Sequence, residues 1–307
     1  MSNIRYTHST MKPSSILTVT RAMCAAAILI CSGVSAAGAM PGEVRFHHEA
    51  TDTTKICSIL AETATHDFAN ASARTAYIAR QFIGTPYVAH TLEGTPEMLT
   101  VNVDEVDCTT YVEMVLALSA TVAEGRSSWH DYLYQLQQLR YRGGEVAGYG
   151  SRLHYICDWV SNNVHRGAIT DATTLMPRCS YIVRSIDYMS SNRDKYPALA
   201  DSAAYADIRH HEMAYRNHRF PYIKTSDLGA KDVKAALREG DVVALVTNMK
   251  NLDVTHMGFV VVNEGEPYLL HASSSHGKVE VSEVPLTTFL KRNRTLMGVR
   301  VLRLTDY

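Results

Sequence analysis

One cysteine in this sequence stands where a nucleophile could form. Cys108 comes immediately before a segment whose apolar residues recur every three or four positions, which is typical of a helix with one buried face. A thiol in the first turn of a helix faces the positive end of the backbone dipole and unpaired N–H groups. Because both favour the thiolate, we expect a lowered pKa for Cys108 and a reactive sulfur.

Two histidines near the C terminus are candidates for the base that such a nucleophile needs. His256 begins one β-branched, apolar run, and His271 lies toward the end of the next run, fifteen residues later. If these runs are neighbouring antiparallel strands, both rings lie at the same end of the sheet. We therefore expect His256 to face Cys108 as the base and His271 to orient it from behind. A nearby imidazolium would lower the thiol pKa further.

The elements that must position these residues divide into a helical part and a β-rich part. Helices are predicted for residues 72–82 and from Cys108 to about Gly125. Five short β-branched runs toward the C terminus predict an antiparallel sheet. These runs are residues 241–248, 256–263, 268–273, 278–284 and 297–304. Helices first and strands last indicate an α+β fold.

The other segments complete the predicted organisation. Residues 40–70 are polar and indicate an arm with a short helix, and residues 71–307 indicate a single domain. Residues 126–235 indicate a long, mostly helical insertion, in which Ser128 begins a capping-box pattern. An insertion between the nucleophile helix and the sheet is a natural place for a specificity wall.

The N-terminal residues indicate export. Basic residues precede an apolar run that is too short to span a bilayer, and small residues suited to cleavage follow, up to Ala39. Met11 is as well placed as Met1 to be the start. We expect residues 1–39 to be a signal peptide and leader, the remainder to be periplasmic or extracellular, and no stable membrane insertion after cleavage. The alternative is an N-terminal anchor that stays attached.

Composition excludes some functions. The chain has 30 Lys and Arg against 31 Asp and Glu, with no basic stripe, so nucleic acid is not an expected partner. Its 14 histidines include no HExxH helix and no paired CxxC segments, so we expect neither a metal nor another cofactor. One disulfide, between Cys157 and Cys179, would be compatible with export, and separate buried thiols are the alternative.

The order of the short motifs resembles a known family. GTPYV, DC, EGDVV, THMGFVV and LLHAS follow one another as in the NlpC-type superfamily of papain-like cysteine hydrolases, which cleave bacterial cell-wall peptides. NVDEVDCTTYVE, RLHYICDWV, DYMSSNRDKYPAL and LDVTHMGFVV are similar to its N-acetylmuramoyl-L-alanine amidase-like branch. The resemblance covers about residues 75–304. The two threonines after the cysteine, in place of the commoner Ser-Gly, fit that branch.

This resemblance implies a papain-like core and assigns roles to five residues. Cys108, His256 and His271 would form a Cys-His-His triad at the start of a helix packed on the antiparallel sheet. Tyr87 would present its hydroxyl near the scissile carbonyl or the peptide amine. Asp107 would tie down the nucleophile loop or bind a ligand amine. The implied partners are peptidoglycan or muropeptide fragments.

Four residues of the insertion are further candidates for binding substrate. Arg152 could grip a stem-peptide carboxylate, with His154 and Asp158 beside it, and Trp159 could pack against a sugar face. The alternative is a core position for Trp159 and a surface ion pair between Arg152 and Asp158.

Together these observations predict an enzyme. We expect hydrolysis, through an acyl-enzyme, of the amide that joins the lactyl group of N-acetylmuramic acid to L-alanine. One alternative is an endopeptidase that cuts the stem peptide after D-glutamate. The other is a non-catalytic cell-wall binding module, which the filled triad positions disfavour.

Overall fold

The computed structural model describes residues 43–306. The predicted leader, with its cleavage position near Ala39, lies outside the described residues. Within residues 43–306, no helix combines the length and the apolar character that crossing a membrane requires.

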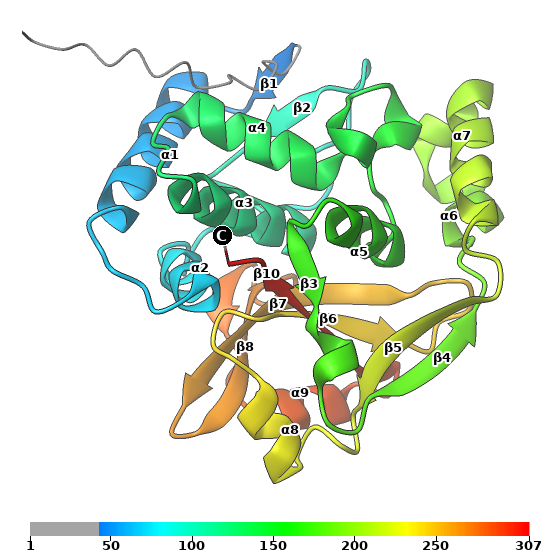
Figure 1. Cartoon of the computed structure of the whole chain (residues 1–307). Helices are drawn as coiled ribbons and strands as arrows, with labels where there is room; N and C mark the ends of the chain where they lie inside the picture. Colours follow the sequence, from blue (N-terminus) through cyan, green and yellow to red (C-terminus); the bar gives the residue numbers. More distant parts are fainter. Residues whose placement is uncertain (1–42, 307) are drawn as a thin grey trace, which may run out of the picture. The chain divides into compact units, whose positions relative to one another are not determined.

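An antiparallel sheet of eight strands forms the centre of the fold (Figure 1). Its order is β4-β5-β10-β6-β7-β8-β9, with β3 paired to β10. The strands are β3 (Ile169–Asp171), β4 (Ser180–Arg184), β5 (His218–Lys224), β6 (Val242–Thr247), β7 (Val254–Asn263), β8 (Glu266–Ser273), β9 (Lys278–Val281) and β10 (Leu296–Leu304). All five predicted C-terminal strands are therefore confirmed, as β6 to β10.

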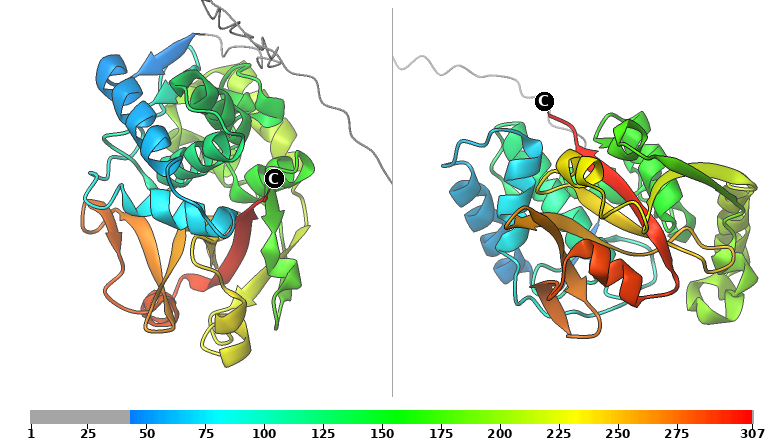
Figure 2. Two further views of the ribbon diagram at one scale, coloured as in Figure 1. Left: turned by 60° about the vertical axis from the view of Figure 1, so that its left-hand side comes forward. Right: turned by 90° about the horizontal axis from the view of Figure 1, so that it is seen from below.

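Helices cover both faces of this sheet (Figures 1 and 2). One side holds α1 (Glu49–Thr63), α2 (Ala71–Arg80), α3 (Cys108–Ala123), α4 (Trp129–Arg140) and α5 (Ile156–His165), together with the parallel strand pair β1 (Val44–Phe46) and β2 (Leu99–Val101). The opposite side holds α8 (Lys231–Ala236) and α9 (Leu286–Arg292). The short α6 (Tyr188–Ser191) and α7 (Ser202–Met213) lie toward β4.

Five short 3₁₀ helices occur in the middle of the chain: η1 (Arg142–Gly144), η2 (Tyr149–Ser151), η3 (Ala172–Leu175), η4 (Arg193–Lys195) and η5 (Pro197–Ala200).

Strand β7 is apolar at almost every position because helices cover both faces of the sheet. Met257 and Phe259 point to the core that contains α3, whereas Val260 points to the core that contains Leu286 and Leu290 of α9. Successive side chains of a strand face opposite sides, so a strand covered on both sides must be apolar at almost every position.

Two predictions about the flanking segments need correction. Residues 40–70 are not merely an arm with a short helix, because α1 is 15 residues long and its Ile56 and Leu60 are fully buried. The insertion is also less helical than predicted, since it contributes β3, β4 and β5 to the sheet. Its capping box is confirmed: Ser128 caps α4 and accepts a hydrogen bond from the Asp131 N–H at 3.2 Å.

Candidate active site

The start of α3 is held by Asp107. Its Oδ1 accepts hydrogen bonds from the N–H groups of Thr109 at 2.9 Å and Thr110 at 2.8 Å. In return, the Thr110 hydroxyl accepts the Asp107 N–H at 2.8 Å, which completes a capping box. Cys108 is thus the first residue of a well-defined helix, and Asp107 fixes the loop before it.

The GTPYV segment joins this helix start to the sheet. The Tyr87 N–H donates to the carbonyl of Gly277, next to β9, at 2.9 Å. The Val106 N–H donates to the carbonyl of Pro86 at 3.0 Å. Tyr87 is therefore held between the end of the sheet and the residues that lead into Cys108.

The structure brings the two predicted histidines into contact. Nε2 of His256 and Nδ1 of His271 lie 2.7 Å apart, with the two rings at 88° to each other. His271 comes directly after Leu270 and His256 comes three residues before Phe259, so both lie beyond the last pair that joins β7 to β8. Gly258 permits this approach, because a Cβ there would lie 2.9 Å from the Cβ of His271.

The sulfur of Cys108 lies beside the strand that carries His256. The backbone N–H of Met257, the residue after His256, lies near this sulfur and favours the thiolate. The sulfur also lies 4.0 Å from the Thr109 hydroxyl. Within the described residues, sulfur and the His256 imidazole do not hydrogen-bond to each other. Nδ1 of His256 has no hydrogen-bond partner there.

Burial decides the charge state of these groups. It raises the pKa of the Cys108 thiol to about 11, and the negative charge of Asp107 acts in the same direction. It lowers the pKa of His256 to about 4 and that of His271 to about 3, the latter helped by the neighbouring His256. At neutral pH the thiol and both imidazoles are therefore neutral. The expected lowering of the thiol pKa is wrong, because desolvation outweighs the helix terminus.

The Tyr87 hydroxyl lies close enough to Cys108 and Asp107 for their charges to affect it. Burial raises its pKa, and the nearby Cys108 and Asp107 add to the shift. The hydroxyl consequently stays protonated and can act as a hydrogen-bond donor.

Arg152 and His154 have partners inside the protein. Arg152 is 6% exposed and forms ion pairs with Glu93 at 3.1 Å and Glu97 at 3.2 Å, both in the loop that follows Tyr87. It therefore anchors that loop, and its guanidinium is already matched to two carboxylates. Nε2 of His154 lies 2.8 Å from a backbone carbonyl, and burial lowers the pKa of this ring to about 3.

Asp158 and Trp159 are also structural. Asp158 pairs with Arg142 and accepts a hydrogen bond from the Tyr215 hydroxyl at 2.8 Å. Trp159 is 0% exposed, so the predicted contact with a sugar face is wrong. The predicted Arg152–Asp158 surface pair is wrong as well, because each of the two has another partner.

Sequence reasoning missed two kinds of contributor. The Met257 N–H acts through the backbone, and no residue type indicates such a role. Glu93 and Glu97 lie in a polar loop without periodicity, so nothing in the sequence pairs them with Arg152.

The cysteines and the metal prediction can be compared with the structure over residues 43–306. Cys57, Cys108, Cys157 and Cys179 are all free thiols, so the Cys157–Cys179 bridge is not formed. In this part of the chain no three His, Cys, Asp or Glu side chains are grouped so that they could hold a metal ion.

Comparison with known proteins places these observations in a family. A family model described as AmiA-like, N-acetylmuramoyl-L-alanine amidase-like, matches residues 77–298. No curated protein matches the chain.

Solved structures agree with the family match. A structure named as an N-acetylmuramoyl-L-alanine amidase from Bacteroides uniformis is 39% identical over 76% of this chain and 99% of its own, with a TM-score of 0.73. A protein from Bacteroides fragilis, named as a candidate xylanase, is 38% identical over 75% of this chain and 100% of its own, with a TM-score of 0.70. A Legionella pneumophila protein, 21% identical over 83% of this chain and 95% of its own, shares the fold with a TM-score of 0.64. The chain therefore belongs to the AmiA-like, N-acetylmuramoyl-L-alanine amidase-like family.

Proposed function

We propose that this protein is an exported cysteine amidase of the NlpC-type, papain-like superfamily. It hydrolyses the amide between the lactyl group of N-acetylmuramic acid and L-alanine in peptidoglycan or its fragments. The observations that support the proposal are the position of Cys108 in the first turn of α3, its interaction with Met257, the residue after His256, and the contact between His256 and His271.

The neutral resting state favours proton transfer during attack. His256 carries its proton on Nε2 and donates it toward Nδ1 of His271, which leaves Nδ1 of His256 as the base. As the sulfur of Cys108 bonds to the lactyl carbonyl carbon, Nδ1 takes the thiol proton. The carbonyl electron pair moves to oxygen. The oxyanion and the His256 imidazolium thus become charged only as a pair, which limits the cost of burial.

The remaining steps return the groups to their starting state. The oxyanion receives hydrogen bonds from the Cys108 backbone N–H and the protonated Tyr87 hydroxyl. The C–N bond breaks as His256 gives its proton to the L-alanine amine, which leaves a thioester. His256 then takes a proton from water as the oxygen attacks that thioester. The sugar carboxylic acid is released, and the thiol regains its proton.

Mass spectrometry of defined muropeptides tests the proposal. The wild type should release the intact stem peptide with a free L-alanine amine and leave an unsubstituted lactyl carboxylate on the sugar. A dipeptide retained on the sugar would show the endopeptidase instead. Absence of any product would show a binding module.

The matched variants are Cys108→Ala and Cys57→Ala, which remove two free thiols of the same fold. Cys108→Ala should lower turnover by at least about 10⁴-fold, because the nucleophile itself is lost. Cys57→Ala should retain wild-type turnover. Equal activity of the two variants would show that Cys108 is not the nucleophile.

A further inference from the structure

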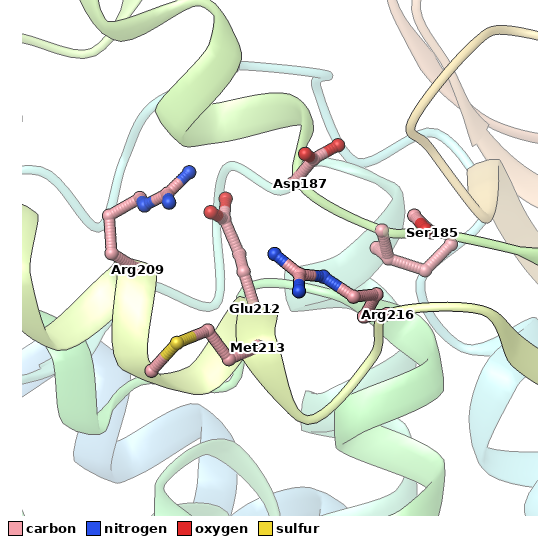
Figure 3. A pocket seen from close by; sticks show the side chains of 7 residues that line it. Ser185, Asp187, Arg209, Glu212, Met213 and Arg216 are labelled. Carbon is pink, nitrogen blue, oxygen red and sulfur yellow. The ribbon is translucent and has the colours of Figure 1, made fainter.

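A second site lies between α7 and the residues that follow β4. A cavity of about 60 Å³ there is lined by Ser185, Ile186, Asp187, Arg209, Glu212, Met213 and Arg216 (Figure 3). None of these residues belongs to the site around Cys108. A water-sized sphere needs about 10–15 Å³ of such space, so the cavity holds only a few non-hydrogen atoms.

Glu212 provides hydrogen-bond acceptors in this cavity. It is 4% exposed, and its Oε1 accepts hydrogen bonds from the Tyr155 hydroxyl at 2.8 Å and the Ser190 N–H at 3.0 Å. Its Oε2 is buried and has no partner within residues 43–306, and the same holds for Oδ1 of Asp187. Because an unpaired buried carboxylate oxygen is costly, both oxygens are suited to receive a donor from a ligand.

Two cations line the same cavity without neutralising these oxygens. Arg209 and Arg216 are exposed, and neither forms an ion pair with Asp187 or Glu212 in the described structure. The Arg209 guanidinium reaches only the Ser190 hydroxyl, at 3.5 Å. The lining thus presents two acidic and two basic groups, with Glu212 between Arg209 and Arg216 in the view of Figure 3.

This charge pattern selects one kind of ligand. A simple cation is repelled by the guanidiniums, and a simple anion is repelled by the carboxylates. We propose that the cavity binds a small zwitterionic α-amino acid, with its ammonium on Asp187 and Glu212 and its carboxylate on Arg209 and Arg216. The apolar Ile186 and Met213 and the small volume favour a side chain the size of alanine.

Calorimetric titration with alanine tests this site directly. Wild type should bind alanine, whereas alanine methyl ester and N-acetylalanine, each lacking one charge, should bind at least about tenfold more weakly. Equal binding of either blocked derivative, or no binding of alanine, would overturn the proposal.

The variants locate the binding. Glu212→Gln keeps an oxygen for Tyr155 and Ser190 but replaces the unpaired oxygen, and Arg216→Ala removes one exposed cation. Both should weaken alanine binding at least about tenfold. Arg294→Ala, an exposed arginine outside the cavity, should leave it unchanged. If Glu212→Gln lowers the melting temperature, Asp187→Asn provides the second test of the acidic side. Alanine binding that survives in all the cavity variants would refute the site.

Cys108→Ala must still bind alanine, because the proposal does not depend on catalysis. A failure of the alanine-site proposal can therefore be told apart from a failure of the proposed amidase function.

Discussion

At the scale of single residues, the main finding is that the thiol of Cys108, the proposed nucleophile, is neutral. Helix position alone favours a thiolate at Cys108, but the surrounding protein removes water from the sulfur and sets Asp107 beside it. The same desolvation keeps His256 neutral and able to accept a proton. The site therefore differs from a preformed thiolate–imidazolium pair, in which the sulfur is charged before substrate arrives.

Alkylation with iodoacetamide distinguishes these two states. With a thiol pKa of about 11, the rate at Cys108 should be low at pH 7 and should rise with pH up to about 11. Peptide mass spectrometry can follow this site separately from Cys57, Cys157 and Cys179. A rate that is already maximal at neutral pH would show a preformed ion pair.

At the scale of elements, the site is formed by the first turn of α3 and the end of the β7–β8 pairing. The capping box fixes the first turn of α3, and the Tyr87 segment connects that turn to the end of β9. The two histidines face each other where the pairing of β7 and β8 stops. The proposed catalytic groups thus lie on regular elements, and the ends of those elements fix their positions.

Substitution of Asp107 separates its structural and ligand-binding roles. Asp107→Ala removes the acceptor for two helix N–H groups and should lower the free energy of unfolding by about 1 kcal/mol. Asp107→Asn keeps an acceptor oxygen and should retain most of that stability. It should also lower the pKa of Cys108, because a negative charge is lost.

Chemical denaturation measures the stability effect, and the alkylation profile measures the pKa. If Asp107 bound a ligand amine instead, Asp107→Asn would lose substrate affinity at unchanged stability, and KM would rise.

At the scale of the whole molecule, one sheet with helices on both faces buries or half-buries several histidines in neutral form. Burial lowers the pKa of His154, His256 and His271. Unfolding exposes these rings and restores a pKa near 6.5. The unfolded chain then binds more protons than the folded chain below that pH, so acid favours unfolding.

We therefore expect the melting temperature to fall as the pH is lowered from 7.5 to 5.5. The sign follows from the lowered pKa values. The stability that the neutral rings contribute is fully present above about pH 6.5 and is lost as the pH falls below that value. Calorimetry at constant ionic strength measures the change. His271→Asn, which removes one of these rings, should make the dependence shallower. A melting temperature that is constant over this range would contradict the burial of neutral histidines.

Much of the fold could be predicted because its signals are local. The β-branched runs between turn residues predicted β6 to β10, and the Ser128 pattern predicted the start of α4. The missed strands β4 and β5 lie in a segment without strong alternation, where pairing with β10 and with each other stabilises them. For α1, three buried apolar residues in a polar sequence are too weak a signal to show that the helix packs in the core.

Residue type and order along the chain by themselves determined the helix that begins at Cys108, the strands that carry His256 and His271, and the resemblance to a family. These depend on periodicity, capping and turn chemistry, which act over a few residues. Only the tertiary structure decided that the thiol is neutral, that Arg152 holds a loop and that Trp159 is in the core. Burial and ion-pair partners come from segments far apart in the chain, and a change in what packs around a group changes its charge and its availability to a ligand.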